Sequence, residues 1–109
     1  MNTPDALAAL AALSHPTRLD AFRLLVRHSP GGLPTGSLVE ASGLTQSTFS
    51  THLAVLAKVG LVSAEKRGRQ QVQHARLDTL RQLMTFLAKD CCEGRAELCE
   101  PLIADLSCC

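Results

Sequence analysis

The side chains with the most distinctive chemistry in this chain are five cysteines, all of which lie between residues 91 and 109. An odd number of cysteines does not suit a framework of paired disulfides. Their spacing also lacks the Cys-x₂₋₄-Cys pairs that are typical of tetrahedral zinc sites. Three neighbouring thiolates instead suit a soft, thiophilic ion. We therefore identify Cys91, Cys92 and Cys99 as candidate metal-binding residues.

These three sulfurs can meet only if the chain turns back after Cys92. On one continuous helix, Cys91 and Cys99 would lie about 12 Å apart along the axis. Gly94 offers the break that a reversal requires. Two alternatives remain open. The cysteines could be small apolar side chains at a helix end. Cys108 and Cys109 could supply a fourth ligand, help to capture the ion, or be a frayed tail.

The elements that position these cysteines belong to one small, helix-rich domain. The chain has 109 residues and only three aromatic side chains, so a core of Leu, Ala and Val is expected, and Leu and Ala favour helices. Residues 1–88 contain nine Lys/Arg and five Asp/Glu, whereas residues 89–109 contain two Lys/Arg and five Asp/Glu. We divide the chain into a basic body, residues 1–90, and an acidic, cysteine-rich tail, residues 91–109.

The location of the protein is predicted from two absences in the sequence. No uninterrupted apolar run approaches the roughly 18 residues of a membrane span, and the first residues lack the basic region of a signal peptide. We expect a cytoplasmic protein with no membrane partner.

The first two helices are predicted by composition and capping residues. A short apolar helix is expected from Asp5 to Leu13. Ser14 can cap a second helix whose first turn includes Pro16. The buried stripe predicted for this second helix consists of Leu19, Phe22, Leu25 and Val26.

A helix-turn-helix is predicted between residues 35 and 60. Thr35 caps a short helix that ends at Gly43. Thr45 caps a second helix, in which Phe49, Leu53 and Leu56 form an apolar face, and which ends before Gly60. The tight turn between two such helices is typical of DNA-binding proteins, where the second helix enters the major groove.

The other face of this second helix is polar and almost uncharged. One interpretation is a half-buried helix with a Ser/Thr-rich surface. The alternative is a surface that approaches base edges and phosphates closely. The candidate DNA-binding residues on it are Gln46, Ser47, Thr48, Ser50, Thr51 and His52.

A β-hairpin with a basic tip is predicted next. Residues 61–67 and 70–77 read as its two arms, with a turn at Gly68-Arg69. Lys66, Arg67 and Arg69 gather at the tip, which favours contact with phosphates or the minor groove. Asp78 then caps a last helix, through about Lys89, with an apolar stripe of Leu80, Leu83, Met84 and Leu87. The predicted fold class is mainly α with a small β wing.

Two motifs closely resemble the ArsR/SmtB family of winged-helix repressors. They are Leu-Ser-His-Pro-Thr-Arg-Leu at 13–19 and Gly-Leu-Thr-Gln-Ser-Thr-Phe-Ser-Thr-His-Leu-Ala-Val-Leu-Ala-Lys-Val-Gly-Leu-Val at 43–62. The resemblance covers roughly residues 5–90. It implies a homodimer through the first and last helices that binds double-stranded operator DNA and releases it when a metal or metalloid binds. Residues 1–90 would then be the DNA-binding and dimerisation domain.

The resemblance also reduces the number of ions that could act as the inducer. The third helix, Ser37-Leu38-Val39-Glu40, lacks the Cys-x-Cys of one arsenic-sensing branch, and residues 79–89 lack the acidic and histidine ligands of the zinc-sensing branch. The tail resembles the arsenite-responsive members with a cysteine triad beyond the last helix. This implies trivalent arsenic or antimony bound by Cys91, Cys92 and Cys99, with no organic cofactor.

Two other functions were weighed against this one. A repressor of the same fold could respond to oxidation of its thiols. A small thiol-dependent arsenate reductase is a poorer match, because no phosphate-binding loop surrounds a cysteine and no Cys-His pair has a suggestive spacing. We expect that the protein is not an enzyme.

Overall fold

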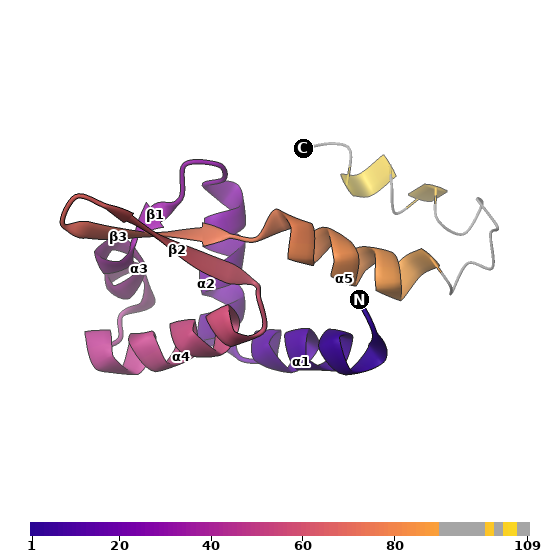
Figure 1. Ribbon diagram of the computed structural model, residues 1–109, viewed down its shortest axis with the longest axis horizontal. Helices are drawn as coiled ribbons and strands as arrows, with labels where there is room; N and C mark the ends of the chain where they lie inside the picture. Colours follow the sequence, from indigo (N-terminus) through magenta and orange to yellow (C-terminus); the bar gives the residue numbers. More distant parts are fainter. Residues whose placement is uncertain (90–99, 102–103, 107–109) are drawn as a thin grey trace.

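The computed structural model describes residues 1–89, 100–101 and 104–106, and it confirms the predicted fold class (Figure 1). The elements in order are α1 (Thr3–Leu13), α2 (Pro16–Arg27), β1 (Leu33–Pro34), α3 (Thr35–Ser42), α4 (Gln46–Lys58), β2 (Val62–Arg67), β3 (Gln70–Ala75) and α5 (Leu77–Lys89). The hairpin of β2 and β3 points to one end of the molecule and α5 to the other. Among the described residues, no helix is long and apolar enough to cross a membrane.

The sheet has three antiparallel strands in the order β1-β3-β2. The hairpin pairs from Val62↔Ala75 to Arg67↔Gln70, which confirms the predicted turn at Gly68-Arg69. β1 adds to the free edge of β3, with Leu33 opposite Gln73. β1 is not predicted from the sequence, because a two-residue strand that contains a proline shows no periodicity.

The core lies where α2, α3, α4 and the start of the hairpin meet. Its largest fully buried side chains are Leu25, Leu38, Phe49, Leu56 and Leu61, each less than 2% exposed. The predicted apolar face of α4 is confirmed at Phe49 and Leu56, whereas Leu53 is half-buried. Phe49 and Leu56 therefore fix the inner face of α4 and leave its other face toward solvent.

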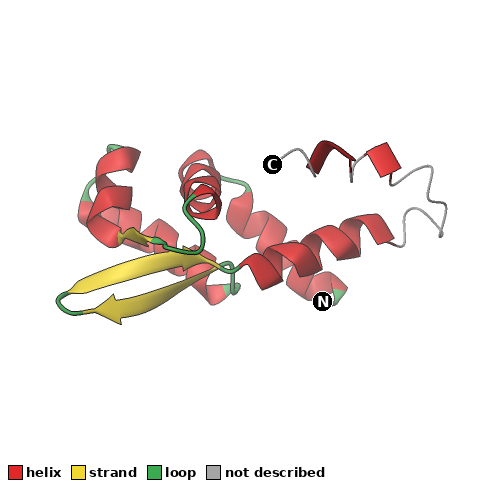
Figure 2. Ribbon diagram, turned by 90° about the horizontal axis from the view of Figure 1, so that it is seen from above, coloured by secondary structure: helices red, strands yellow, loops and turns green. Residues whose placement is uncertain are grey.

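The two terminal helices lie side by side, with the N-terminus next to α5 in both views (Figures 1 and 2). α1 turns a face of small residues inward, and Leu7 and Leu10 remain 61% and 39% exposed. The buried face of α1 consists of Ala6, Ala9 and Ala12.

The apolar stripe of α5 is divided between the core and the surface. Leu83 is 3% exposed, whereas Leu77 and Leu87 are each 46% exposed. Leu83 is thus part of the core of the subunit rather than of the outer apolar face predicted for this helix. The expectation that Leu19 is buried in α2 was also wrong, since this side chain is 40% exposed.

Several predicted helix starts were wrong by one or two residues. α1 begins at Thr3 because Asn2 accepts a hydrogen bond from the Asp5 backbone N–H, 2.8 Å. The cap of α2 is His15 and not Ser14, whose hydroxyl instead donates to Ala11 at the end of α1.

The starts of α3 and α5 differ for similar reasons. Pro34 precedes α3, and no side chain caps it, because the Thr35 hydroxyl donates to the Gln71 carbonyl across the sheet. α5 begins at Leu77, so Asp78 lies in its first turn. The predicted cap of α4 is confirmed, since Thr45 Oγ1 accepts from the Thr48 backbone N–H at 3.3 Å.

Candidate nucleic-acid interface

The outer face of α4 carries five of the six polar residues predicted for it. Gln46, Ser47, Thr48, Ser50 and Thr51 are all exposed. Thr48 and Thr51 already hydrogen-bond within this helix region, to Thr45 and to the Ser47 carbonyl. The side chains of Gln46 and Ser50 make no hydrogen bond to any described residue. These two side chains therefore have free donors and acceptors to offer to an incoming ligand.

A groove runs between α4 and the wing formed by β2 and β3. The wing supplies Arg69, Gln71 and Gln73 to this groove, and α4 supplies Gln46 and Ser50. Gln71 and Gln73 are not among the DNA-binding residues predicted from the sequence. The available signal was the strand alternation, which puts both on one face of β3.

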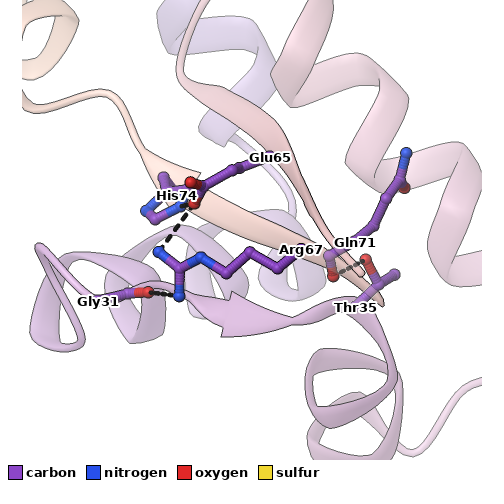
Figure 3. Close-up of polar contacts among 6 residues, drawn as sticks. All are labelled: Gly31, Thr35, Glu65, Arg67, Gln71 and His74. Atoms are coloured by element: carbon purple, nitrogen blue, oxygen red, sulfur yellow. Dashed lines mark hydrogen bonds and ion pairs between the residues drawn. The ribbon is translucent and has the colours of Figure 1, made fainter. Parts of the chain in front are cut away.

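Strand β3 of the wing is joined to the start of α3 by a short polar relay. Gln73 is 3% exposed, and its Nε2 donates to Thr35 Oγ1 at 3.0 Å. The Thr35 hydroxyl in turn donates to the Gln71 carbonyl at 3.2 Å, as Figure 3 shows. A buried amide is costly unless it is hydrogen-bonded, so this relay fixes the angle of the wing relative to the helix-turn-helix.

The opposite face of the wing contacts the loop that follows α2. Glu65 lies 2.8 Å from both Arg67 Nη2 and His74 Nε2, and Arg67 Nη1 donates to the Gly31 carbonyl at 3.4 Å (Figure 3). The hydrogen bond from His74, then that from Arg67, lowers the pKa of Glu65 below its usual value. Gly32, with φ of 75°, lies close to the Gln73 carbonyl and the His74 ring of β3.

The three basic residues predicted at the hairpin tip therefore differ. Arg67 is held by Glu65 and Gly31. Lys66 and Arg69 are exposed and have no ion pair within the described part of the chain. A phosphate would have to compete with Glu65 for Arg67, whereas it would meet Lys66 and Arg69 without competition.

His52 is the exception among the α4 candidates. Its half-buried ring lies 3.2 Å from Arg18 Nη1, measured from Nδ1, and 4.4 Å from the His15 ring between centroids. Burial, then the neighbouring His15 and Arg18, lowers the pKa of His52. The side chain is engaged with α2 instead of standing free on the outer face.

The predicted cysteine site, Cys91, Cys92 and Cys99, lies outside the described residues, as do Cys108 and Cys109. Within residues 1–89, 100–101 and 104–106, no three His, Cys, Asp or Glu side chains gather in a way that could bind a metal ion.

Three bacterial regulators are similar to this chain. It is 35% identical over 91 residues to the "Probable mercury resistance operon repressor" of Streptomyces lividans, covering 80% of this chain and 70% of that protein. It is 44% identical over 76 residues to the regulator CmtR of Mycobacterium bovis, and the match covers 69% of this chain and 61% of CmtR. It is 40% identical over 65 residues to the regulator NmtR of Mycobacterium tuberculosis, and the match covers 60% of this chain and 52% of NmtR. The matched part of the chain thus spans about half of NmtR.

Solved structures share the fold. An ArsR-like transcriptional regulator from Rhodococcus sp. RHA1 superposes with a TM-score of 0.72 at 24% identity, covering 89% of each chain. The homodimeric winged helix-turn-helix DNA-binding domain Mb0332 of Mycobacterium bovis superposes with a TM-score of 0.64 at 23% identity, covering 83% of this chain and 82% of that one. A family model described as a helix-turn-helix domain also matches residues 13–63. The chain therefore belongs to the ArsR/SmtB family of winged-helix transcriptional regulators, and not to a family of enzymes.

Proposed function

We propose that this protein is a dimeric, cytoplasmic repressor that binds operator DNA through α4 and the wing. In this proposal, trivalent arsenic or antimony binds Cys91, Cys92 and Cys99 and causes release of the DNA. The observation that supports DNA binding most directly is the outer face of α4, where exposed side chains without charge stand beside the basic tip of the wing.

Each part of that surface suits one part of a duplex. Gln46 and Ser50 can reach base edges, because amides and hydroxyls both donate and accept hydrogen bonds. Lys66 and Arg69 are free to neutralise phosphates. Gln71, on the wing face that lines the same groove, adds a further polar group beside α4.

The proposed dimer rests on the apolar surface of the terminal helices. Leu7 and Leu10 of α1 and Leu77 and Leu87 of α5 are all more than a third exposed. An apolar patch of this kind marks an interaction surface. The related domain Mb0332 is homodimeric, which supports a second copy of this chain as the partner.

The inducer is inferred from the tail sequence and from thiol chemistry. Trivalent arsenic and antimony favour three soft thiolates, and binding would release protons as the thiols ionise. Mercuric ion is the competing inducer, because it is also thiophilic and one relative is described as a mercury resistance operon repressor. Oxidation of the same thiols is the remaining alternative.

The inducer is tested by titrating arsenite, antimonite, mercuric ion and zinc into the protein–DNA complex with reductant present. The DNA is a duplex enriched from a random-sequence library. Arsenite or antimonite should release it from the unsubstituted protein, and Cys91→Ser should abolish the release without loss of binding. Cys108→Ser is the matched control and should respond as the unsubstituted protein does. Release from Cys91→Ser at unchanged arsenite would exclude this site. A parallel titration with peroxide and without reductant tests the redox alternative, which release by peroxide alone would favour.

The DNA surface is tested by comparing two neighbouring arginines. Arg69→Ala should flatten the dependence of affinity on salt by about one charge. Arg67→Ala should change it less, because Arg67 is paired with Glu65. Gln46→Ala and Ser50→Ala should weaken binding to the enriched duplex more than to a scrambled one. An unchanged salt dependence in Arg69→Ala would show that the wing does not contact the backbone of DNA.

A further inference from the structure

Three polar side chains meet where α1, α2 and α4 come together, and the groove beside the wing includes none of them. Arg18, in the first turn of α2, donates from Nε to the Ala12 carbonyl of α1 at 2.6 Å. Its Nη1 lies 3.2 Å from His52 Nδ1 on α4. The His15 ring stacks at a tilt of 35° on the His52 ring. We call His15, Arg18 and His52 the clasp.

The donors and acceptors of the clasp require neutral histidines. A guanidinium can only donate, so His52 Nδ1 must accept, and the His52 ring then holds its proton on Nε2. His15 is under the same constraint, because its Nδ1 accepts from the Thr17 backbone N–H at 3.1 Å. A proton added to either ring would replace an acceptor by a donor and break one of these contacts.

The surroundings of the clasp give no compensation for an added charge. α1 presents the uncharged Ala12 carbonyl to it, and α2 presents Arg18 and His15. α4 has no other charged side chain before Lys58 in its last turn. α2 also carries Asp20, two residues after Arg18, but neither this nor another carboxylate contributes to the shift in the pKa of His52. A protonated His52 would therefore face the Arg18 guanidinium without an acid to balance it.

We propose that the clasp is a proton-sensitive connection between α4 and α1, and that protonation of His52 opens it and weakens sequence-specific DNA binding. The effect on DNA rests on the proposed function, in which α4 enters the major groove. Phe49 and Leu56 keep α4 packed on the core when the clasp opens, so the helix shifts without unfolding. Because α1 belongs to the proposed dimer interface, the clasp also sets how α4 is placed relative to the second subunit.

The clasp itself is tested without DNA, by following the histidine ring resonances of the full chain against pH. His52 should titrate below the ordinary imidazole pKa, and the Ala12 amide should shift with the same midpoint as His52. In Arg18→Gln the His52 midpoint should rise toward the ordinary imidazole pKa. In His52→Gln the pH-dependent shift of Ala12 should disappear. A His52 midpoint at the ordinary imidazole pKa in the unsubstituted protein, or an Ala12 amide shift that does not follow the His52 titration, would overturn the clasp.

Its effect on DNA is measured as the ratio of affinities at about pH 7.5 and about pH 5.5, on either side of the ordinary imidazole pKa. For the enriched duplex, the affinity should fall at least about fivefold more than for a scrambled duplex. His28→Gln, the matched control, should keep this difference, and His52→Gln should lose it. Equal pH 7.5 to pH 5.5 affinity ratios in His28→Gln and His52→Gln would refute the coupling of the clasp to DNA binding. Failure to enrich any duplex would refute the proposed function instead, while the ring titration would still decide the clasp.

Discussion

The close approach of the loop after α2 to β3 gives a quantitative prediction about Gly32. A Cβ at this position would lie 2.6 Å from the Gln73 carbonyl oxygen and 2.7 Å from His74 Cε1, at a φ of +75°. The positive φ alone costs an alanine roughly 1–2 kcal/mol. The Gln73 carbonyl cannot yield without moving β3, and such overpacking adds about 1–3 kcal/mol.

Gly68 provides the matched control, because it has a φ of +61° and nothing within 4 Å of the added Cβ. Gly68→Ala should therefore lose about 1–2 kcal/mol of unfolding free energy from the backbone alone. Gly32→Ala should lose about 1–3 kcal/mol more than that. Urea unfolding of the two variants and the unsubstituted protein measures both losses.

The refuting result is an equal loss in the two variants, within about 0.5 kcal/mol, which is the usual effect of an exposed substitution. It would mean that the loop after α2 does not approach β3 as closely as the structure shows. A larger loss in Gly32→Ala, together with weaker protection of the β3 amides from hydrogen exchange, would support the contact.

Three further predictions concern a cap, an ion pair and the subunit interface. Thr45→Ala should cost about 1 kcal/mol in urea unfolding, because the Thr48 backbone N–H loses its acceptor, whereas Ser47→Ala should cost less. The pKa of Glu65 is lowered in the folded protein. The ionised Glu65 side chain therefore stabilises the fold above the ordinary carboxyl pKa, and this stabilisation is lost as pH falls through the pKa of the folded state. In Glu65→Gln, the free energy of unfolding measured across the acidic range should depend less on pH. Leu7→Glu should convert a dimer into a monomer in sedimentation at micromolar concentration, and a monomeric unsubstituted protein would contradict the proposed interface.

The sequence was enough to predict the type and order of nearly all elements. The spacing of Phe49, Leu53 and Leu56, the cap at Thr45 and the turn at Gly68 are local signals, because each depends on residues within one or two helical turns or one hairpin. They predicted α4 and the wing correctly. Helix starts were predicted less accurately, since His15 replaced Ser14 as the cap of α2 and α1 begins at Thr3, two residues before the expected Asp5.

Only the tertiary structure decided which side chains on this frame are free. Arg67 and Arg69 look equivalent in the sequence, yet Arg67 is bound to Glu65 and to Gly31, which lies 36 positions away. His52 reads as a member of a polar helix face, but Arg18, 34 positions away, turns it inward. Local periodicity cannot specify such contacts, because they depend on how separate elements pack, and packing determined which polar residues remain available for binding.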